Sequence, residues 1–132
     1  MTPSTSSQTL PTISVVTVNF NTAHHVLRSL ETLSVDSHPR IAQAIIIDNA
    51  SSDDSREQLA HLQGKVQIEW KQQNIGFGRA NNQAIEQVDT AYVCLVNPDV
   101  RLTDKSLTTM AEYVDAHPDV AAVGCAMMSR DG

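Results

Sequence analysis

Four short apolar runs of this chain each end in a cluster of acidic or amide side chains. Residues 19–21 (NFN) follow the run ISVVTV, and residues 48–53 (DNASSD) follow AIII. Residues 74–78 (NIGFG) follow the stretch 66–70, and residues 97–99 (NPD) follow YVCLV. Runs rich in Val and Ile that alternate with helical patterns are typical of parallel strands in an α/β sheet. Because ligands bind beyond the carboxyl ends of such strands, the sequence predicts a binding site at one edge of a sheet.

The periodicity of the chain predicts five strands separated by four helices. The strands are expected over residues 13–18, 44–48, 66–71, 92–96 and 120–123, and the fourth is expected to be fully buried. Amphipathic helical patterns lie between them, and Ser51 or Ser52 is expected to cap the second helix. This alternation predicts a doubly wound, mainly parallel sheet with helices on both faces.

Composition limits the kinds of partner. With 132 residues the chain is one domain, and its net charge of -6 argues against nucleic acid, because phosphate backbones require clustered Lys and Arg. No apolar stretch approaches the roughly 20 residues that a membrane-spanning helix requires. Residues 1–12 are rich in Ser and Thr, so we expect a disordered tail there, in a cytoplasmic protein, followed by a domain over residues 13–132.

The cysteines and histidines give no metal or redox motif. Cys94 and Cys125 lie inside apolar runs and are expected to pack in the core as reduced thiols. The five histidines have no metal-ligand spacing such as HExxH, and we expect all five at the surface.

Two acidic residues stand at predicted strand ends. Asp48 can accept hydrogen bonds from a ribose hydroxyl or a base N–H, or it can cap the next turn, and its position fits both roles equally. Pro98 has no N–H and ends the fourth strand, which leaves Asp99 at the sheet edge. Mg²⁺ and Mn²⁺ take one or two carboxylates together with substrate phosphates, although a type I turn explains the NPD sequence as well.

The glycine loop before the third predicted helix does not match the glycine pattern of dinucleotide-binding loops. Gly76 and Gly78 permit close backbone approach, and a helix N-terminus attracts anions. The third glycine of the dinucleotide fingerprint is absent, and the loop does not follow the first strand. Asn81 and Asn82 are poor helix-interior residues, so we expect packing or a ligand to engage their amides.

Five segments taken in order, VVTVNFN, IIIDNASSD, QNIGFGRANNQAI, VNPDV and AHPDVAAVG, resemble the family 2 glycosyltransferases, especially the rhamnosyltransferase-like branch. The resemblance extends from about residue 13 to the C-terminus. It implies the GT-A fold, a Rossmann-like α/β sheet whose first half binds a nucleotide-sugar donor.

The resemblance also implies roles for individual residues. One set of residues would form the base pocket, contact the ribose, shape the neighbouring loop and border the donor sugar. The set is Thr17, Asn19, Phe20, Asp48, Asn49, Ser51, Asp53, Gly76, Phe77, Gly78, Asn81, Asn82 and Asn97. Residues 97–99 occupy the place of the family's DXD motif, which makes Asp99 the expected ligand of Mg²⁺ or Mn²⁺. Asn97 replaces the first Asp of that motif and removes one negative charge.

The reaction implied is transfer of a sugar, with rhamnose suggested by the branch, from a dTDP- or UDP-linked donor to an acceptor hydroxyl with inversion. The acceptor would be a glycan or a lipid-linked molecule in cell-envelope polysaccharide synthesis, and the enzyme would be cytoplasmic or peripheral at the inner face of the membrane. The family continues well past the segment that matches residues 129–132. We therefore expect a donor-binding half, without the acceptor pocket and general base, that is weakly active or inactive alone and self-associates through its uncovered sheet edge.

Two alternatives remain open at this point. The chain could be a non-catalytic module that binds a nucleotide or nucleotide sugar, since no general base is identified. A dinucleotide oxidoreductase would reuse Asp48 for ribose, but it lacks the glycine-rich turn after the first strand.

Overall fold

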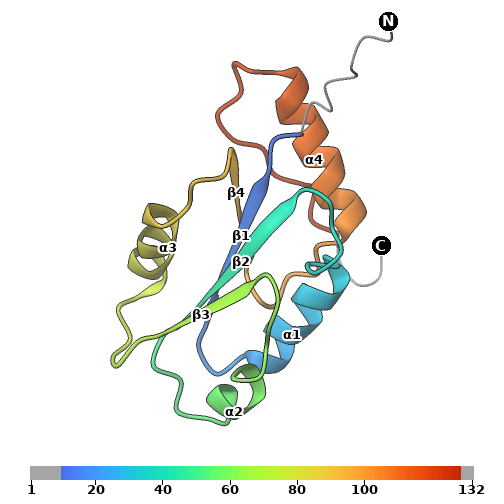
Figure 1. The fold of residues 1–132 in the computed structure, drawn as a ribbon. Coiled ribbons are helices and arrows are strands. Elements are labelled where there is room, and N and C mark those ends of the chain that lie inside the picture. Colours follow the sequence, from blue (N-terminus) through green and yellow to red (C-terminus); the bar gives the residue numbers. More distant parts are fainter. Residues whose placement is uncertain (1–9, 129–132) are drawn as a thin grey trace, which may run out of the picture.

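The computed structural model describes residues 10–128. Strands and helices alternate along them (Figure 1), in the order β1 (Ile13–Asn19), α1 (Ala23–Thr32), β2 (Ile41–Asp48), α2 (Ser55–Leu59), β3 (Val66–Trp70), α3 (Phe77–Glu86), β4 (Tyr92–Leu95) and α4 (Asp104–Ala116). Of the tail expected over residues 1–12, residues 1–9 lie outside the described residues. Within the described part, the carbonyl oxygens of Pro11 and Thr12 accept hydrogen bonds from Arg40 and Tyr92.

The four strands form one parallel sheet in the order β3-β2-β1-β4. All residues of β1 are buried because β1 lies inside the sheet and helices cover both of its faces. The register places Asn19 beside Asp48 at the carboxyl ends of β1 and β2. The chain proceeds outward from β1 to β3 and then returns to the other side of β1 to form β4. The carboxyl ends of β1 and β4 therefore flank a topological switch point, where ligands bind in such sheets. The predicted doubly wound sheet is confirmed.

Helices cover both faces of the sheet (Figure 1), and each face has its own apolar packing. On one face Ala80 and Ala84 of α3 pack against β1 and β2, and these small side chains let the helix approach the sheet closely. On the opposite face Val26 of α1, Leu59 of α2 and Leu107 of α4 are buried against the strands. The predicted placement of helices on both faces is confirmed.

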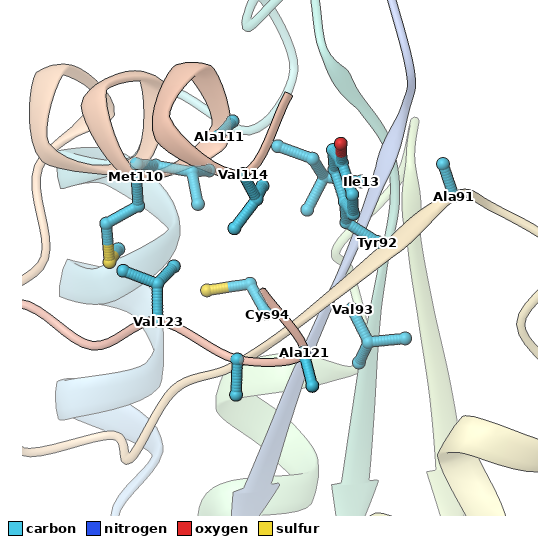
Figure 2. A pocket seen from close by; sticks show the side chains of 12 residues that line it. Ile13, Ala91, Tyr92, Val93, Cys94, Met110, Ala111, Val114, Ala121 and Val123 are labelled. Carbon is cyan, nitrogen blue, oxygen red and sulfur yellow. The ribbon is translucent and has the colours of Figure 1, made fainter. Parts of the chain in front are cut away.

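The expectation of a fifth strand over residues 120–123 is wrong. Figure 2 shows this segment opposite β4 across an apolar cavity of about 330 Å³, lined on its two sides by Cys94 and Val123. The segment forms no ladder with the described strands, so β4 is an edge strand. The expected full burial of β4 is therefore also wrong: Val93 and Leu95 are 37% and 53% exposed, because α3 covers β1 and β2 instead.

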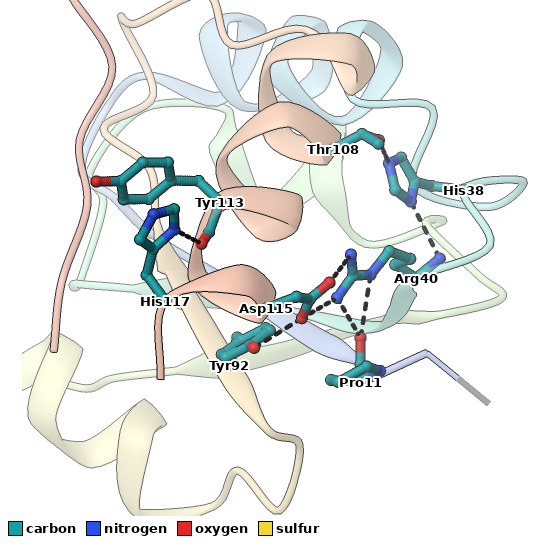
Figure 3. A network of polar contacts seen from close by, with 8 residues as sticks. All are labelled: Pro11, His38, Arg40, Tyr92, Thr108, Tyr113, Asp115 and His117. Carbon is teal, nitrogen blue, oxygen red and sulfur yellow. Dashed lines mark hydrogen bonds and ion pairs between the residues drawn. The ribbon is translucent and has the colours of Figure 1, made fainter. Parts of the chain in front are cut away.

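A polar network fixes α4 to the amino-terminal end of the sheet (Figure 3). The buried guanidinium of Arg40 donates to both carboxylate oxygens of Asp115, at 2.8 and 3.0 Å, and also to the carbonyl oxygen of Pro11. The hydroxyl of Tyr92 donates to Asp115 at 2.7 Å. The hydrogen bonds from Arg40 and Tyr92 lower the pKa of Asp115, and the bond to Asp115 raises the pKa of Tyr92. These residues lie far from the carboxyl edge of the strands and hold the architecture together.

Two expectations about single residues are wrong. His38 is buried, its Nδ1 accepts the backbone N–H of Arg40 at 3.1 Å, and its Nε2 lies 3.0 Å from the hydroxyl of Thr108. Cys125 is exposed, because its segment has no strand to join. Cys94 is partly buried, and burial raises the pKa of its thiol to about 11. Among residues 10–128, no helix is both long and apolar enough to cross a membrane.

Candidate functional site

A buried polar network joins the carboxyl ends of β1 and β2. Asn19 is fully buried and donates its side-chain amide to Asp48 at 2.8 Å and to Ser51 at 3.1 Å. Ser51 in turn donates its hydroxyl and its backbone N–H to Asp48, at 2.7 and 3.1 Å. Asp48 therefore caps the turn after β2. A carboxylate has about four lone-pair sites, so these three donors leave room for one more hydrogen bond.

The loops after β1 and β2 are tied together by Asn21. Its side-chain oxygen accepts the backbone N–H groups of Ser52 and Asp53, at 2.9 and 3.2 Å. Asn21 and Ala50 have φ angles of 56° and 63°, a left-handed conformation that Asn tolerates far better than Ala. The strained Ala50 is held in place by the hydrogen bonds of its neighbours, which makes this a preformed loop. The sequence analysis placed Asn21 in a polar cluster but gave it no role of its own, although an Asn after a strand is a recognisable cue for this conformation.

The expected serine cap of α2 is wrong. The helix begins at Ser55, and its backbone N–H is accepted by the carboxylate of Asp53 at 2.9 Å. The hydrogen bonds from Ser55 lower the pKa of Asp53. Ser51 is instead used by the network with Asn19 and Asp48.

Asn49 connects the glycine loop to β2. It is 2% exposed, its amide donates to the carbonyl oxygen of Gly76 at 3.2 Å, and its side-chain oxygen accepts the N–H of Ile75 at 2.9 Å. Gly76 precedes α3 with a φ of 88° and gives no side-chain cap, so the first N–H groups of α3 have no cap from that position. A Cβ at Gly76 or Gly78 would meet nothing within 4 Å. This end of α3 is thus open and suited to an anion.

The residues around the start of α3 divide into buried and exposed groups. Asn81 is buried and donates to the carbonyl oxygen of Phe77 at 3.1 Å, so packing engages its amide. Asn82 is exposed. The rings of Phe20 and Phe77 are 46% and 55% exposed, which leaves two large apolar faces in solvent at the carboxyl edge.

The loop after β4 is fastened to both β1 and α1. The buried hydroxyl of Thr17 donates to the carbonyl oxygen of Val96 at 2.7 Å, so Thr17 holds the end of β4. The hydroxyl of Ser29 donates to the carbonyl oxygen of Pro98 at 3.1 Å, and that of Thr32 donates to Leu102 at 2.9 Å. These two helix residues, which the sequence did not single out, position the loop that carries Asp99.

Asn97 and Asp99 are exposed on this loop, in which the N–H of Val100 bonds back to Asn97. Within the part of the chain that the structure describes, no three His, Cys, Asp or Glu side chains come together as a metal site. Asp99 is thus a single candidate carboxylate. A divalent ion there would take its other ligands from substrate phosphates and water, as Mg²⁺ commonly does.

The parallel sheet with its polar carboxyl edge belongs to the class of open α/β sheets, in which ligands bind at a switch point. The chain belongs to glycosyl transferase family 2, whose family model matches residues 14–132. The predicted family and GT-A-like α/β fold are thereby confirmed, and the oxidoreductase alternative has no support.

Individual relatives agree with this family. The chain is 24% identical over 126 residues to TuaG of Bacillus subtilis (strain 168), named as a teichuronic acid biosynthesis glycosyltransferase, covering 92% of the chain and 50% of that protein. It is 25% identical over 129 residues to the N-acetylglucosaminyl-diphospho-decaprenol L-rhamnosyltransferase of Mycobacterium tuberculosis (strain ATCC 25618 / H37Rv), covering 89% and 42%.

Solved structures show the same fold. The mannosyltransferase PcManGT from Pyrobaculum calidifontis, in complex with GDP-Man and Mn²⁺, superposes with a TM-score of 0.78 at 19% identity, over 92% of this chain and 37% of that one. Residues 1–349 of S. aureus TarS, in complex with UDP-GlcNAc, give a TM-score of 0.67 at 19% identity, over 81% and 32%. The chain spans half or less of the length of each of these relatives.

Proposed function

We propose that this protein transfers a sugar from a nucleoside-diphosphate sugar to an acceptor hydroxyl with inversion, and that residues 13–132 form its donor-binding part. The observation that carries the proposal is the arrangement of Asp48, Asn49 and Gly76 on the β2 side of the end of β1, with the loop of Asp99 following β4 on the other side of β1, in a chain of glycosyl transferase family 2. Relatives named for L-rhamnosyl transfer and a solved relative with GDP-Man support this donor class. We propose a dTDP- or UDP-linked donor, with rhamnose as the sugar.

In this proposal the polar edge binds the nucleotide. The remaining acceptor position of Asp48 bonds the base or ribose, and the exposed ring of Phe20 stacks on the base. The N–H of Gly76 is accepted by the side-chain oxygen of Asn74 at 2.9 Å, so Gly76 shapes the loop, and the open amides of Phe77 and Gly78 face the diphosphate. The other expected residues contribute by forming the pocket wall or its loops: Thr17, Asn19, Asn49, Ser51, Asp53, Asn81, Asn82 and Asn97.

Asp99 is proposed to hold Mg²⁺ or Mn²⁺. When bound, such an ion neutralises the charge that builds on the departing diphosphate. The neutral Asn97 leaves Asp99 as the anionic protein ligand on this loop, so the donor's own phosphates have to complete the coordination. Ser29 and Thr32 keep the loop in place for this purpose.

The general base and acceptor pocket are proposed to lie in the part of such an enzyme that exceeds the length covered by this chain. The acceptor is proposed to be a glycan or a lipid-linked molecule in polysaccharide synthesis, reached at the cytoplasmic face of the membrane. The exposed edge of β4, with Val93 and Leu95, is proposed to favour a homo-oligomer.

Calorimetric titration of the chain with dTDP, UDP and GDP, each with and without Mn²⁺, tests the donor site. One nucleotide is expected to bind more tightly when Mn²⁺ is present. Asp99→Ala is expected to remove the Mn²⁺ dependence and keep the metal-free binding, whereas the exposed Asp89→Ala is a matched control that should change neither. Absence of binding by all three nucleotides in both conditions would refute the donor site.

A second candidate is a non-catalytic module that binds nucleotide sugars. It is favoured by the state of the site carboxylates: Asp48 and Asp53 are engaged in hydrogen bonds, and Asp99 is assigned to the metal. No carboxylate of the described site is then left as general base. Assayed on a protein that also carries the proposed acceptor part, donor binding without release of nucleoside diphosphate in the presence of sugar acceptors would favour this module over the enzyme.

A further inference from the structure

A hollow of about 740 Å³ lies between α1 and the loop that joins β4 to α4. One side of it is formed by His25 and Arg28 of α1, and another by Asp99 and Arg101 of the loop. Its position is maintained by Ser29, whose hydroxyl bonds the loop backbone. The hollow is on the α1 side of Asp99, whereas the glycine loop leads to α3 on the other face of the sheet.

The charge of this hollow is opposite to that of the whole chain. The chain has a net charge of -6, but two guanidinium groups line the hollow against one carboxylate. The ion pairs of the described residues are Arg40–Asp115 and Lys71–Glu69, so within that part of the chain no acidic side chain pairs with Arg28 or Arg101. Two exposed arginines without partners are suited to bidentate binding of phosphate oxygens.

The remaining wall of the hollow is apolar. Leu102, Met127 and Met128 line it, and the two methionines are 76% and 80% exposed. Large exposed apolar side chains beside a cationic surface are typical of an interaction site, and methionine adapts its shape to many apolar ligands. The surface therefore offers cationic and apolar contacts within one cavity.

We propose that this hollow is a phosphate-binding site in which Arg28 and Arg101 hold a phosphate or diphosphate group. The group can come from two sources, a nucleoside diphosphate or a phosphate carried on an apolar chain such as a prenyl diphosphate. A divalent ion at Asp99 would make the hollow more positive, but the site does not require it. Asp99 borders both this site and the proposed donor site, whereas Arg28 and Arg101 have no role in the donor site. The nucleoside-diphosphate source rests on the proposed function, and the apolar-linked source does not.

Calorimetric titration in EDTA with geranyl diphosphate and with UDP, together with UDP in Mn²⁺, tests this site. The double variant Arg28→Gln, Arg101→Gln is compared with wild type, and Arg56→Gln is the control for loss of a positive charge outside the hollow. Both hollow arginines are exposed, so the fold is expected to persist, and an unchanged urea midpoint verifies it. Arg28→Lys, Arg101→Lys keeps the charge and is expected to restore part of the affinity.

The double glutamine variant is expected to weaken binding of at least one probe by about tenfold or more, because charge-assisted hydrogen bonds are lost. A loss confined to geranyl diphosphate identifies the apolar-linked source, and a loss confined to UDP identifies the nucleotide. Unchanged affinity for every probe, or an equal loss in Arg56→Gln, overturns the site. If the variant binds geranyl diphosphate as wild type does and keeps Mn²⁺-dependent UDP binding, this inference is refuted and the donor site remains intact.

Discussion

Replacing Asn49 by alanine is expected to detach the glycine loop from the end of β2. The substitution removes two hydrogen bonds, from the side-chain amide to Gly76 at 3.2 Å and from the N–H of Ile75 at 2.9 Å. Each is worth about 1 kcal/mol, and a buried group left without a partner costs about 1–3 kcal/mol. The carbonyl oxygen of Gly76 keeps the N–H of Ala80 as a partner, and the partly buried N–H of Ile75 can reach water, so neither is left unsatisfied. We therefore expect the loss of the two bonds alone, about 2 kcal/mol.

Urea unfolding followed by circular dichroism measures this loss. With a slope of about 2 kcal/mol/M, a change of about 2 kcal/mol lowers the midpoint by about 1 M without changing the slope. Asn82→Ala is the matched control, since this exposed neighbour on α3 should change stability by no more than about 0.5 kcal/mol. A midpoint for Asn49→Ala within about 0.3 M of wild type, or an equal shift in the control, would show that the two hydrogen bonds do not hold the loop.

Three further results are expected. Hydrogen bonds lower the pKa of Asp115, so the stability that it contributes is complete above its ordinary pKa of 3.8 and is lost as the pH falls below that value. Acid unfolding of Asp115→Asn should lack this component. An acid-unfolding curve like that of wild type would contradict the pairing with Arg40. Iodoacetamide at pH 8 should label the exposed Cys125 and spare Cys94, because a pKa of about 11 leaves about one Cys94 thiol in a thousand ionised. Peptide mass spectrometry measures the labelling, and equal labelling of both cysteines would disprove the burial of Cys94. Ser29→Ala should weaken Mn²⁺-dependent nucleotide binding severalfold and spare metal-free binding, and calorimetry showing the same loss in both conditions would argue against a role in positioning the metal loop.

The local pattern of the sequence was sufficient for the strands that have neighbours. The run over residues 13–18 predicts β1 because Val and Ile alternate with polar residues of strand type, and the central position of β1 then buries it. Residues 120–123 have an equally apolar pattern, yet they form no strand. A strand is completed by hydrogen bonds to a neighbour, and a pattern within one segment carries no information about whether that neighbour is present.

The same limit applies to single residues. His38 is followed by proline in a loop, which favours the surface, but the approach of Thr108 from α4 buries it. Asp48 fitted ligand binding and capping equally from its position. Its contact with Asn19 joins residues 29 positions apart and depends on β1 and β2 being adjacent.

By itself the sequence determined the alternation of strands and helices, the parallel sheet and the gathering of polar groups at its carboxyl edge. The alternation follows from residue periodicity, which is a local property, and the parallel direction follows from the helical connection between consecutive strands. Tertiary structure alone decided which polar groups are occupied and which are free. Asn19, Asn49 and Thr17 are engaged with backbone or side-chain partners, whereas Asp99 and the arginines of the hollow stay accessible. The reason is that hydrogen bonding and burial depend on contacts between segments far apart in the chain, and the order of the strands sets those contacts.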